Sequence, residues 1–178
     1  MRLIALVLCL LGWPAYANDW DALREPGAVA IMRHALAPGT GDPANFTLDD
    51  CDTQRNLDAR GRAQARRLGE ALRERGLTFD AVLSSQWCRG LETAELLGLG
   101  AVEEAPVLNS FFRDRSTRDA QTRELRAFLR QQDKRLMLVT HFVNIRALTG
   151  QGVGSGETLV IRMAPDGIEV LGRIRIEP

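Results

Sequence analysis

Short apolar runs bounded by polar residues form the first pattern along this chain. Most are nearly continuous, without the alternation of a strand that has one face in water, so they indicate strands buried on both faces. Near the C-terminus two further runs flank Pro165-Asp166-Gly167, and this combination predicts a hairpin. The predicted strands are 28–33, 79–85, 135–141, 158–164 and 168–176, with a short strand at best within 102–108.

Between these runs, apolar residues recur with helical spacing. In 60–76, Ala65, Leu68 and Leu72 fall on one helical face, and Gly76 ends the helix. In 86–98 the same spacing places Trp87 toward the core. Strands that alternate with helices predict an α/β fold, with a mainly parallel sheet covered by helices on both faces. The predicted helices are 60–76, 86–98, 119–132 and 144–150.

Length and charge narrow the class of protein. The 178 residues suffice for one domain with a sizeable core, and no linker or internal repeat divides them. The chain carries 23 Lys and Arg against 23 Asp and Glu, and this balance does not suggest a nucleic-acid partner. We therefore predict a single domain over residues 18–178.

Residues 1–17 differ from the rest of the chain. Arg2, an apolar run, and small residues at Ala15 and Ala17 predict a secretory signal cut after Ala17. The alternative is a retained membrane anchor, but the run is short for a bilayer. No later segment is apolar enough to cross a membrane, so we expect an exported protein without stable membrane insertion.

Two cysteines remain after this signal, Cys51 and Cys88. An even number in an exported protein is compatible with one disulfide, which here would tether the loop 38–52 to the segment around Cys88. Two separate buried thiols are the alternative.

Charged and polar residues follow three of the predicted strands. Arg33 and His34 end the first strand, Ser85 ends the second, and His141 ends the strand 135–141. Arg89 lies in the first turn of the helix after Ser85. Because the carboxyl ends of parallel strands share one edge of a sheet, we expect these side chains to converge.

This combination suits phosphoryl chemistry. Guanidinium groups of Arg33 and Arg89 can hold phosphate oxygens. A neutral imidazole can accept a phosphoryl group, and a second imidazole, if protonated, can stabilise charge on its oxygens. Two histidines and no paired cysteine motif leave little for a zinc site.

The motifs resemble those of the histidine phosphatase superfamily, which has the phosphoglycerate mutase-like fold. The resemblance covers "RHA", "LDARGRAQARRLG", "SSQWCRGLETA" and "LVTHFVNI", in the order and spacing of the family. It implies His34 as the phosphorylated nucleophile, with Arg33, Arg89 and His141 around the phosphoryl group. It also implies a three-layer sandwich and a phosphoric monoester hydrolase that works without a metal or cofactor, and the residue inventory agrees.

The chain departs from the family pattern in two places. Ala35 replaces the glycine after the histidine, and "LNS" stands where related enzymes place a glutamate. The general acid must then lie elsewhere. Asp114 is the first candidate, and its rivals are Asp49, Asp50 and Asp52.

The segment "DCDTQRNL" and the export signal are similar to small periplasmic histidine phosphatases, including the lipopolysaccharide core heptose(II)-phosphate phosphatases. This implies a periplasmic enzyme acting on a small phosphorylated substrate, such as a lipopolysaccharide core sugar. A catalytically silent phospho-ligand binding protein and a phosphomutase are the alternatives. A second anionic group of the substrate, if present, has four candidate partners: Arg55, Arg113, Arg115 and Arg118. Plain surface charges are the alternative for these four side chains, and the sequence slightly favours it.

Overall fold

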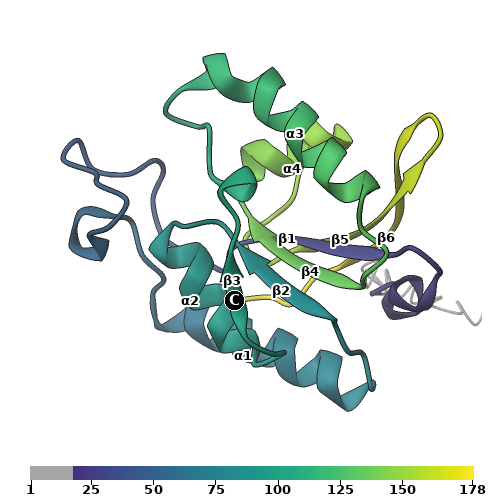
Figure 1. Cartoon of the computed structure of the whole chain (residues 1–178). Helices are drawn as coiled ribbons and strands as arrows, with labels where there is room; N and C mark the ends of the chain where they lie inside the picture. The colour runs from purple at the N-terminus through teal and green to yellow at the C-terminus, as the bar shows by residue number, and fades with distance from the viewer. Residues whose placement is uncertain (1–17) are drawn as a thin grey trace, which may run out of the picture.

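The computed structural model describes residues 18–178, and at its centre lies a six-stranded sheet in the order β3-β2-β4-β1-β5-β6 (Figure 1). β3, β2, β4 and β1 run parallel, whereas β5 is antiparallel to both β1 and β6. The predicted α/β fold with a mainly parallel sheet is confirmed. The strands are β1 Val29–Arg33, β2 Ala81–Ser84, β3 Val102–Glu104, β4 Leu136–Thr140, β5 Thr158–Ala164 and β6 Gly167–Ile174.

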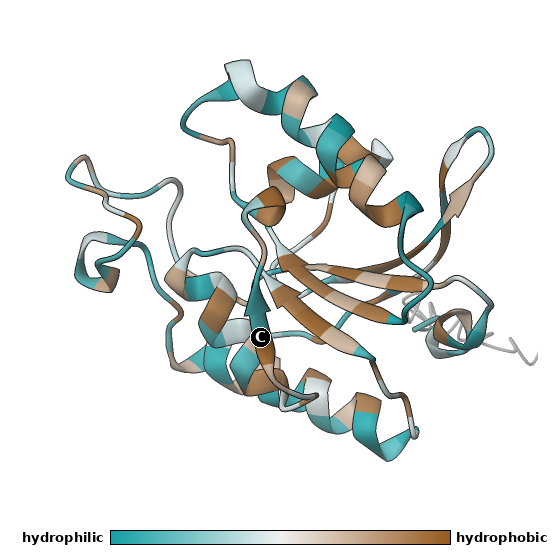
Figure 2. Cartoon of the chain, in the orientation of Figure 1, coloured by the Kyte–Doolittle hydropathy of each residue, from teal (hydrophilic) through white to brown (hydrophobic). Residues whose placement is uncertain are grey.

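Helices cover both faces of the sheet and so make three layers (Figure 1). One pair packs against one face, where Leu68 and Leu97 are buried, and the other pair covers the opposite face, where Leu125 and Ile145 are buried. Hydropathy follows the layers, with apolar strands and amphipathic helices (Figure 2). The first pair is α1 Ala59–Glu74 and α2 Cys88–Leu97, and the second is α3 Arg118–Arg130 and α4 Phe142–Thr149.

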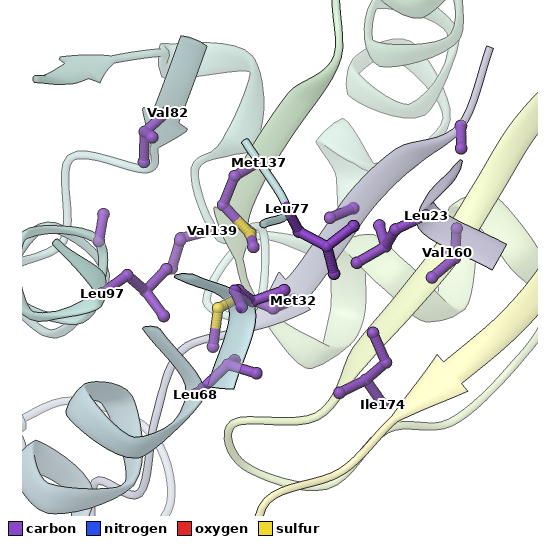
Figure 3. Close-up of a cluster of buried hydrophobic side chains, with 14 residues drawn as sticks. Leu23, Met32, Leu68, Leu77, Val82, Leu97, Met137, Val139, Val160 and Ile174 are labelled. Carbon is purple, nitrogen blue, oxygen red and sulfur yellow. The ribbon is translucent and has the colours of Figure 1, made fainter. Parts of the chain in front are cut away.

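The continuous apolar character of β1 follows from these layers. Met32 contributes to the cluster beneath α1 and α2 (Figure 3), whereas its neighbour Ile31 contributes to the cluster beneath α3 and α4. Because successive strand residues point to opposite faces, a strand covered on both sides needs an apolar residue at every position. Such a strand fixes the place of the charged residues at its end.

The short strand expected within 102–108 is observed as Val102–Glu104, and a 3-10 helix, Pro106–Leu108, follows it. Residues Trp20–Arg24 form another 3-10 helix. The predicted secretory signal, residues 1–17, lies outside the described residues. Within 18–178, no helix has both the length and the apolar character needed to span a membrane.

Candidate active site

The strand register brings the predicted site residues to one edge of the sheet. Arg33 of β1 lies opposite Thr140 of β4, so His34 and His141 each stand one residue beyond a paired strand end. The backbone N–H of His34 donates to Thr140 O at 2.9 Å, and that of Ser85 donates to Val139 O at 3.0 Å. The expected convergence at the carboxyl ends is therefore observed.

The two imidazole rings face each other at the base of this edge. Their centroids are 5.4 Å apart, and His34 and His141 are 2% and 3% exposed. His34 Nδ1 lies 2.8 Å from Ala35 O, which can only accept, so the ring proton is assigned to Nδ1. The lone pair is then on Nε2, which accepts from Arg89 Nε at 3.2 Å. This nitrogen is the candidate nucleophile.

Both imidazoles are held in the neutral form. Burial lowers the pKa of His34 well below its usual value, and the charges of Arg89, Arg33 and Arg55 lower it further. Burial likewise lowers the pKa of His141, with His34 and the same guanidinium groups adding to the effect. A neutral His34 has an unprotonated Nε2, whose lone pair is needed for attack on phosphorus.

His141 is oriented by its neighbours. Its Nε2 lies 2.9 Å from Ser85 Oγ, and the indole of Trp87 meets its ring edge-on with centroids 5.3 Å apart. Trp87 is buried, as expected, and also lines the cavity, since the residue sits just before α2 and stacks on Phe46. Helical spacing cannot separate a core position from a cavity wall when both are buried.

Arg89 is almost completely buried and paired with a carboxylate that the sequence analysis missed. Its Nη1 donates to Asp42 Oδ1 at 2.6 Å and its Nη2 to Asp42 Oδ2 at 3.2 Å. Asp42 also accepts from the indole N–H of Trp87. Burial alone would raise the pKa of Asp42, but the Arg89 hydrogen bonds and charge outweigh it, so that pKa lies below its usual value. Asp42 is therefore an anion.

Two further guanidinium groups line the cavity. Arg33 donates from Nη1 to Val153 O at 3.4 Å, and its Nε is buried without a hydrogen-bond partner. Arg55 donates from Nε to Gly41 O at 2.8 Å and from Nη1 to Ala37 O. Burial lowers the pKa of Arg55 to about 10, and the neighbouring Arg89 adds to this. Both groups remain cations at neutral pH.

Together these side chains bound a cavity of about 280 Å³ at the edge of the sheet. One part of its wall is aromatic or apolar, and Phe112, at 40% exposed, is the only large exposed hydrophobic residue in the described range. Arg113 also lines the cavity, whereas Arg115 and Arg118 do not. The remaining lining residues are Arg33, His34, Gly39, Thr40, Gly41, Asp42, Arg55, Trp87, Arg89, Ser110, His141, Phe142 and Val143.

Asp114 lies outside this cavity lining, contrary to the expectation that it would serve as general acid. Its carboxylate is exposed, and Oδ1 accepts from the backbone N–H of Ser116 at 3.0 Å and from its hydroxyl. These two hydrogen bonds lower the pKa of Asp114. The side chain thus caps a 3-10 helix, Arg115–Thr117. Asp49, Asp50 and Asp52 do not line the cavity either.

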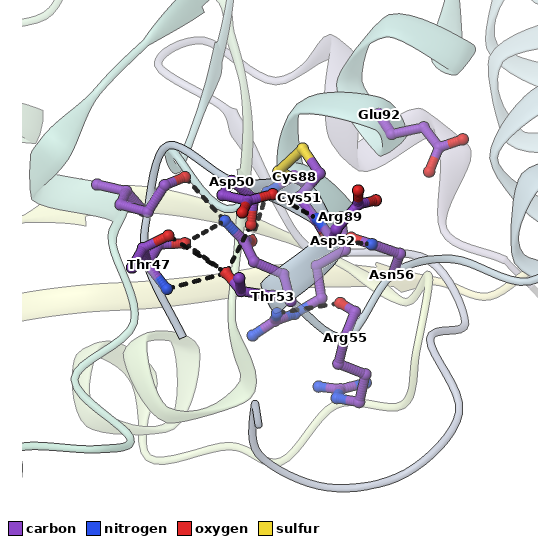
Figure 4. Close-up of a disulfide and its surroundings, with 12 residues drawn as sticks. Thr47, Asp50, Cys51, Asp52, Thr53, Arg55, Asn56, Cys88, Arg89 and Glu92 are labelled. Carbon is purple, nitrogen blue, oxygen red and sulfur yellow. Dashed lines mark hydrogen bonds between the residues drawn. A yellow bond between two sulfur atoms is a disulfide. The ribbon is translucent and has the colours of Figure 1, made fainter. Parts of the chain in front are cut away.

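The loop between β1 and α1 carries Asp42 and Arg55 into the site. Cys51 and Cys88 form a disulfide, as predicted, which joins this loop to the first residue of α2 (Figure 4). Gln54 Oε1 also accepts from the backbone N–H of Cys88 at 3.0 Å. These two links fix the loop beside Arg89.

The fold and the residues at the sheet edge agree with a family comparison. The model of the histidine phosphatase superfamily (branch 1) matches residues 29–124, more than half of the chain. The chain therefore belongs to this superfamily. The match contains Arg33, His34 and Arg89, and His141 follows it.

Individual relatives match a shorter part of the chain than the family model does. Mitochondrial serine/threonine-protein phosphatase Pgam5 of Drosophila grimshawi is 42% identical over 84 residues, 47% of this chain, and the Drosophila virilis protein is 31% identical over the same length. The match spans 28% of each relative.

Solved structures share the fold. The protein histidine phosphatase SixA complexed with tungstate has a TM-score of 0.58 at 17% identity, covering 83% of this chain and 96% of SixA. A phosphoserine phosphatase mutant from Entamoeba histolytica, in complex with phosphoserine, has a TM-score of 0.57 at 12% identity. The match covers 80% of this chain and 94% of the phosphatase. These similarities support the phosphoglycerate mutase-like architecture.

Proposed function

We propose that this protein is a phosphomonoesterase that works through a phosphohistidine on His34. The observation that carries the proposal is the lone pair of His34 Nε2, which meets the Nε–H of Arg89 at 3.2 Å inside the cavity. A phosphoryl group transferred to this nitrogen has the Arg89 guanidinium beside it and Arg33 on the same cavity wall. Phosphoryl transfer depends mainly on such positioning and charge neutralisation.

The reaction has two steps. As substrate binds, the Nε–H of Arg89 shifts from His34 Nε2 to a phosphoryl oxygen, which frees the lone pair. His34 Nε2 then attacks phosphorus, the bond from phosphorus to the ester oxygen breaks, and the alcohol leaves after taking up a proton. Water then attacks the phosphohistidine, which releases inorganic phosphate and returns the neutral imidazole. Within residues 18–178, Asp42 is the only carboxylate that lines the cavity, and Arg89 holds it as an anion. Water therefore supplies the proton to the leaving oxygen.

The proposed substrate is a phosphorylated sugar of the cell envelope. A sugar ring has apolar C–H faces and hydroxyl edges. The cavity wall offers both kinds of partner, with the aromatic rings of Phe112 and Phe142 beside the polar side chains of Thr40 and Ser110. Arg113 lies at the same wall, held over the Phe46 ring at 5.2 Å, and supplies a further cation.

The proposed location is the periplasm, with export through the signal at residues 1–17. The disulfide between Cys51 and Cys88 supports this proposal, because structural disulfides persist mainly in oxidising compartments.

A catalytically silent phospho-ligand binding protein is the second candidate. The observation that favours it is that Asp42, the one cavity carboxylate among the described residues, is ionised and so has no proton to donate. Turnover separates the two candidates.

The test is hydrolysis of p-nitrophenyl phosphate and of a panel of sugar phosphates by the mature protein and by His34→Ala. We expect release of phosphate by the wild type and a loss of at least about 10³-fold in His34→Ala. Asp114→Asn is the matched control, expected to retain the wild-type rate. Equal rates in wild type and His34→Ala would exclude the proposed mechanism. Phosphate binding without turnover of any ester would favour the binding protein.

A further inference from the structure

The ion pair between Asp42 and Arg89 is unusual in its burial. The two side chains are 5% and 4% exposed, and the pair connects the loop after β1 with the first turn of α2. Taking two charges out of water carries a large desolvation cost, which their mutual attraction must offset. An arrangement of this kind inside a cavity calls for a functional explanation, because an apolar pair would fill the space at lower cost.

The hydrogen-bond donors of Arg89 are divided between two directions. Nη1 and Nη2 face Asp42 end-on, and Nη1 also donates to Arg55 O at 3.2 Å. Nε points the other way, toward His34 Nε2. A guanidinium has five N–H groups in a rigid plane, so the partners at the end of the plane determine where its side edge points. That edge consists of Nε–H and the remaining N–H of Nη2.

Asp42 is itself fixed by groups other than Arg89. Oδ1 accepts from the backbone N–H of Arg55 at 3.1 Å, and Oδ2 accepts from Trp87 Nε1 at 3.1 Å. The carboxylate therefore has four donors around it and little freedom to rotate.

We propose that Asp42 is a positioning residue, which holds the Arg89 guanidinium end-on so that its side edge faces the phosphoryl group on His34. The inference rests on the proposed function and assigns Asp42 a role through Arg89, without contact with the substrate. In this arrangement Asp42 and a bound phosphoryl group occupy different edges of one guanidinium and do not compete.

The role differs from that of a general acid in its dependence on the leaving group. A misplaced Arg89 slows transfer from every ester, whereas loss of a proton donor slows only esters with poor leaving groups. The discriminating variant is Asp42→Asn, which keeps the shape of the side chain and removes one acceptor. Glu92→Gln is the matched control. Glu92 lies on α2, the helix that carries Arg89, and pairs with Arg62 outside the cavity.

The kinetic experiment is a double-mutant cycle with Asp42→Asn and Arg89→Lys, measured on p-nitrophenyl phosphate and on an alkyl phosphate. We expect Asp42→Asn to lower kcat/KM by about 10- to 100-fold on both esters, as removal of an orienting partner does elsewhere. In the Arg89→Lys background the same substitution is expected to change kcat/KM by less than about threefold. Glu92→Gln is expected to match the wild type.

A second measurement needs neither turnover nor a folded Asp42 variant. In ¹⁵N-arginine-labelled wild-type protein, the Arg89 signal is identified by its absence from Arg89→Lys. We expect separate Nη proton signals for Arg89, because the end-on fork hinders rotation of the guanidinium.

The outcomes separate this inference from the proposed function. A loss confined to the alkyl ester would make Asp42 the general acid and overturn the positioning role. An unchanged rate in Asp42→Asn, equal losses in both backgrounds, or a freely rotating Arg89 would also overturn it. If the wild type hydrolyses no ester, the proposed function fails and the Arg89 signals decide the geometry of the pair by themselves.

Discussion

Removal of the disulfide provides the most quantitative test of how the site is assembled. In Cys51→Ser/Cys88→Ser the loop that carries Asp42 loses its covalent link to α2. The two cysteines are 37 residues apart in sequence. For a closed loop of this length, the lost restriction on the unfolded chain amounts to about 4 kcal/mol at 25 °C. For a domain of this size, that loss lowers Tm by roughly 10 °C.

The effect on activity is expected to be smaller than the effect on stability. Gln54 still holds the backbone N–H of Cys88, and Asp42 still holds Arg89, so the loop keeps its place while the protein is folded. At 25 °C we expect kcat/KM of the double variant to lie within about tenfold of the wild type, because a small displacement of Arg89 slows phosphoryl transfer only moderately.

The assay is urea unfolding of the oxidised wild type and the double variant, followed by circular dichroism. The control is the wild type with and without a thiol reductant, since Cys51 and Cys88 are the only cysteines in residues 18–178. A difference in unfolding free energy below about 1 kcal/mol would refute the reasoning from chain entropy. So would two alkylatable thiols in the denatured, unreduced protein.

Three further predictions concern charge and packing. Because burial lowers the pKa of His34 and His141, both imidazoles take up a proton in the unfolded chain at a higher pH than in the folded protein. The free energy of unfolding should therefore fall below pH 6.5, by up to about 1.4 kcal/mol per pH unit for each histidine. Urea unfolding at pH 7.5 and pH 5.5 measures this fall, and an equal free energy at the two pH values contradicts it. Gly69→Ala should destabilise by about 1–3 kcal/mol in urea unfolding, since its Cβ would lie 1.9 Å from Leu97 O. Phe112→Ala should raise KM about tenfold for sugar phosphates and leave the KM for glycerol phosphate unchanged. An equal rise in KM for both substrates would argue against contact between the sugar ring and Phe112.

The sequence was sufficient for the sheet and for the four central side chains. Continuous apolar runs predict strands buried on both faces, and parallel strands end at one edge, so the sequence alone predicts that Arg33, His34 and His141 lie together. Arg89 followed from its place in the first turn after β2.

Asp42 was not predictable in the same way. It lies in a loop, 34–58, that has no periodicity, and Asp49, Asp50 and Asp52 in the same loop look equivalent in sequence. Only the path of the loop, fixed by the disulfide and Gln54, brings Asp42 to Arg89. The same limit applies to Asp114, whose side chain turns to the nearby Ser116 instead of the cavity.

The central claim is that His34 Nε2 becomes phosphorylated. The most direct measurement is rapid acid-free quenching of the mature protein during turnover of a ³²P-labelled phosphomonoester, followed by peptide mapping. The account predicts an acid-labile, base-stable phosphate on the peptide that contains His34, absent from His34→Ala. Turnover with no label on the protein, or a label on any other residue, would contradict it.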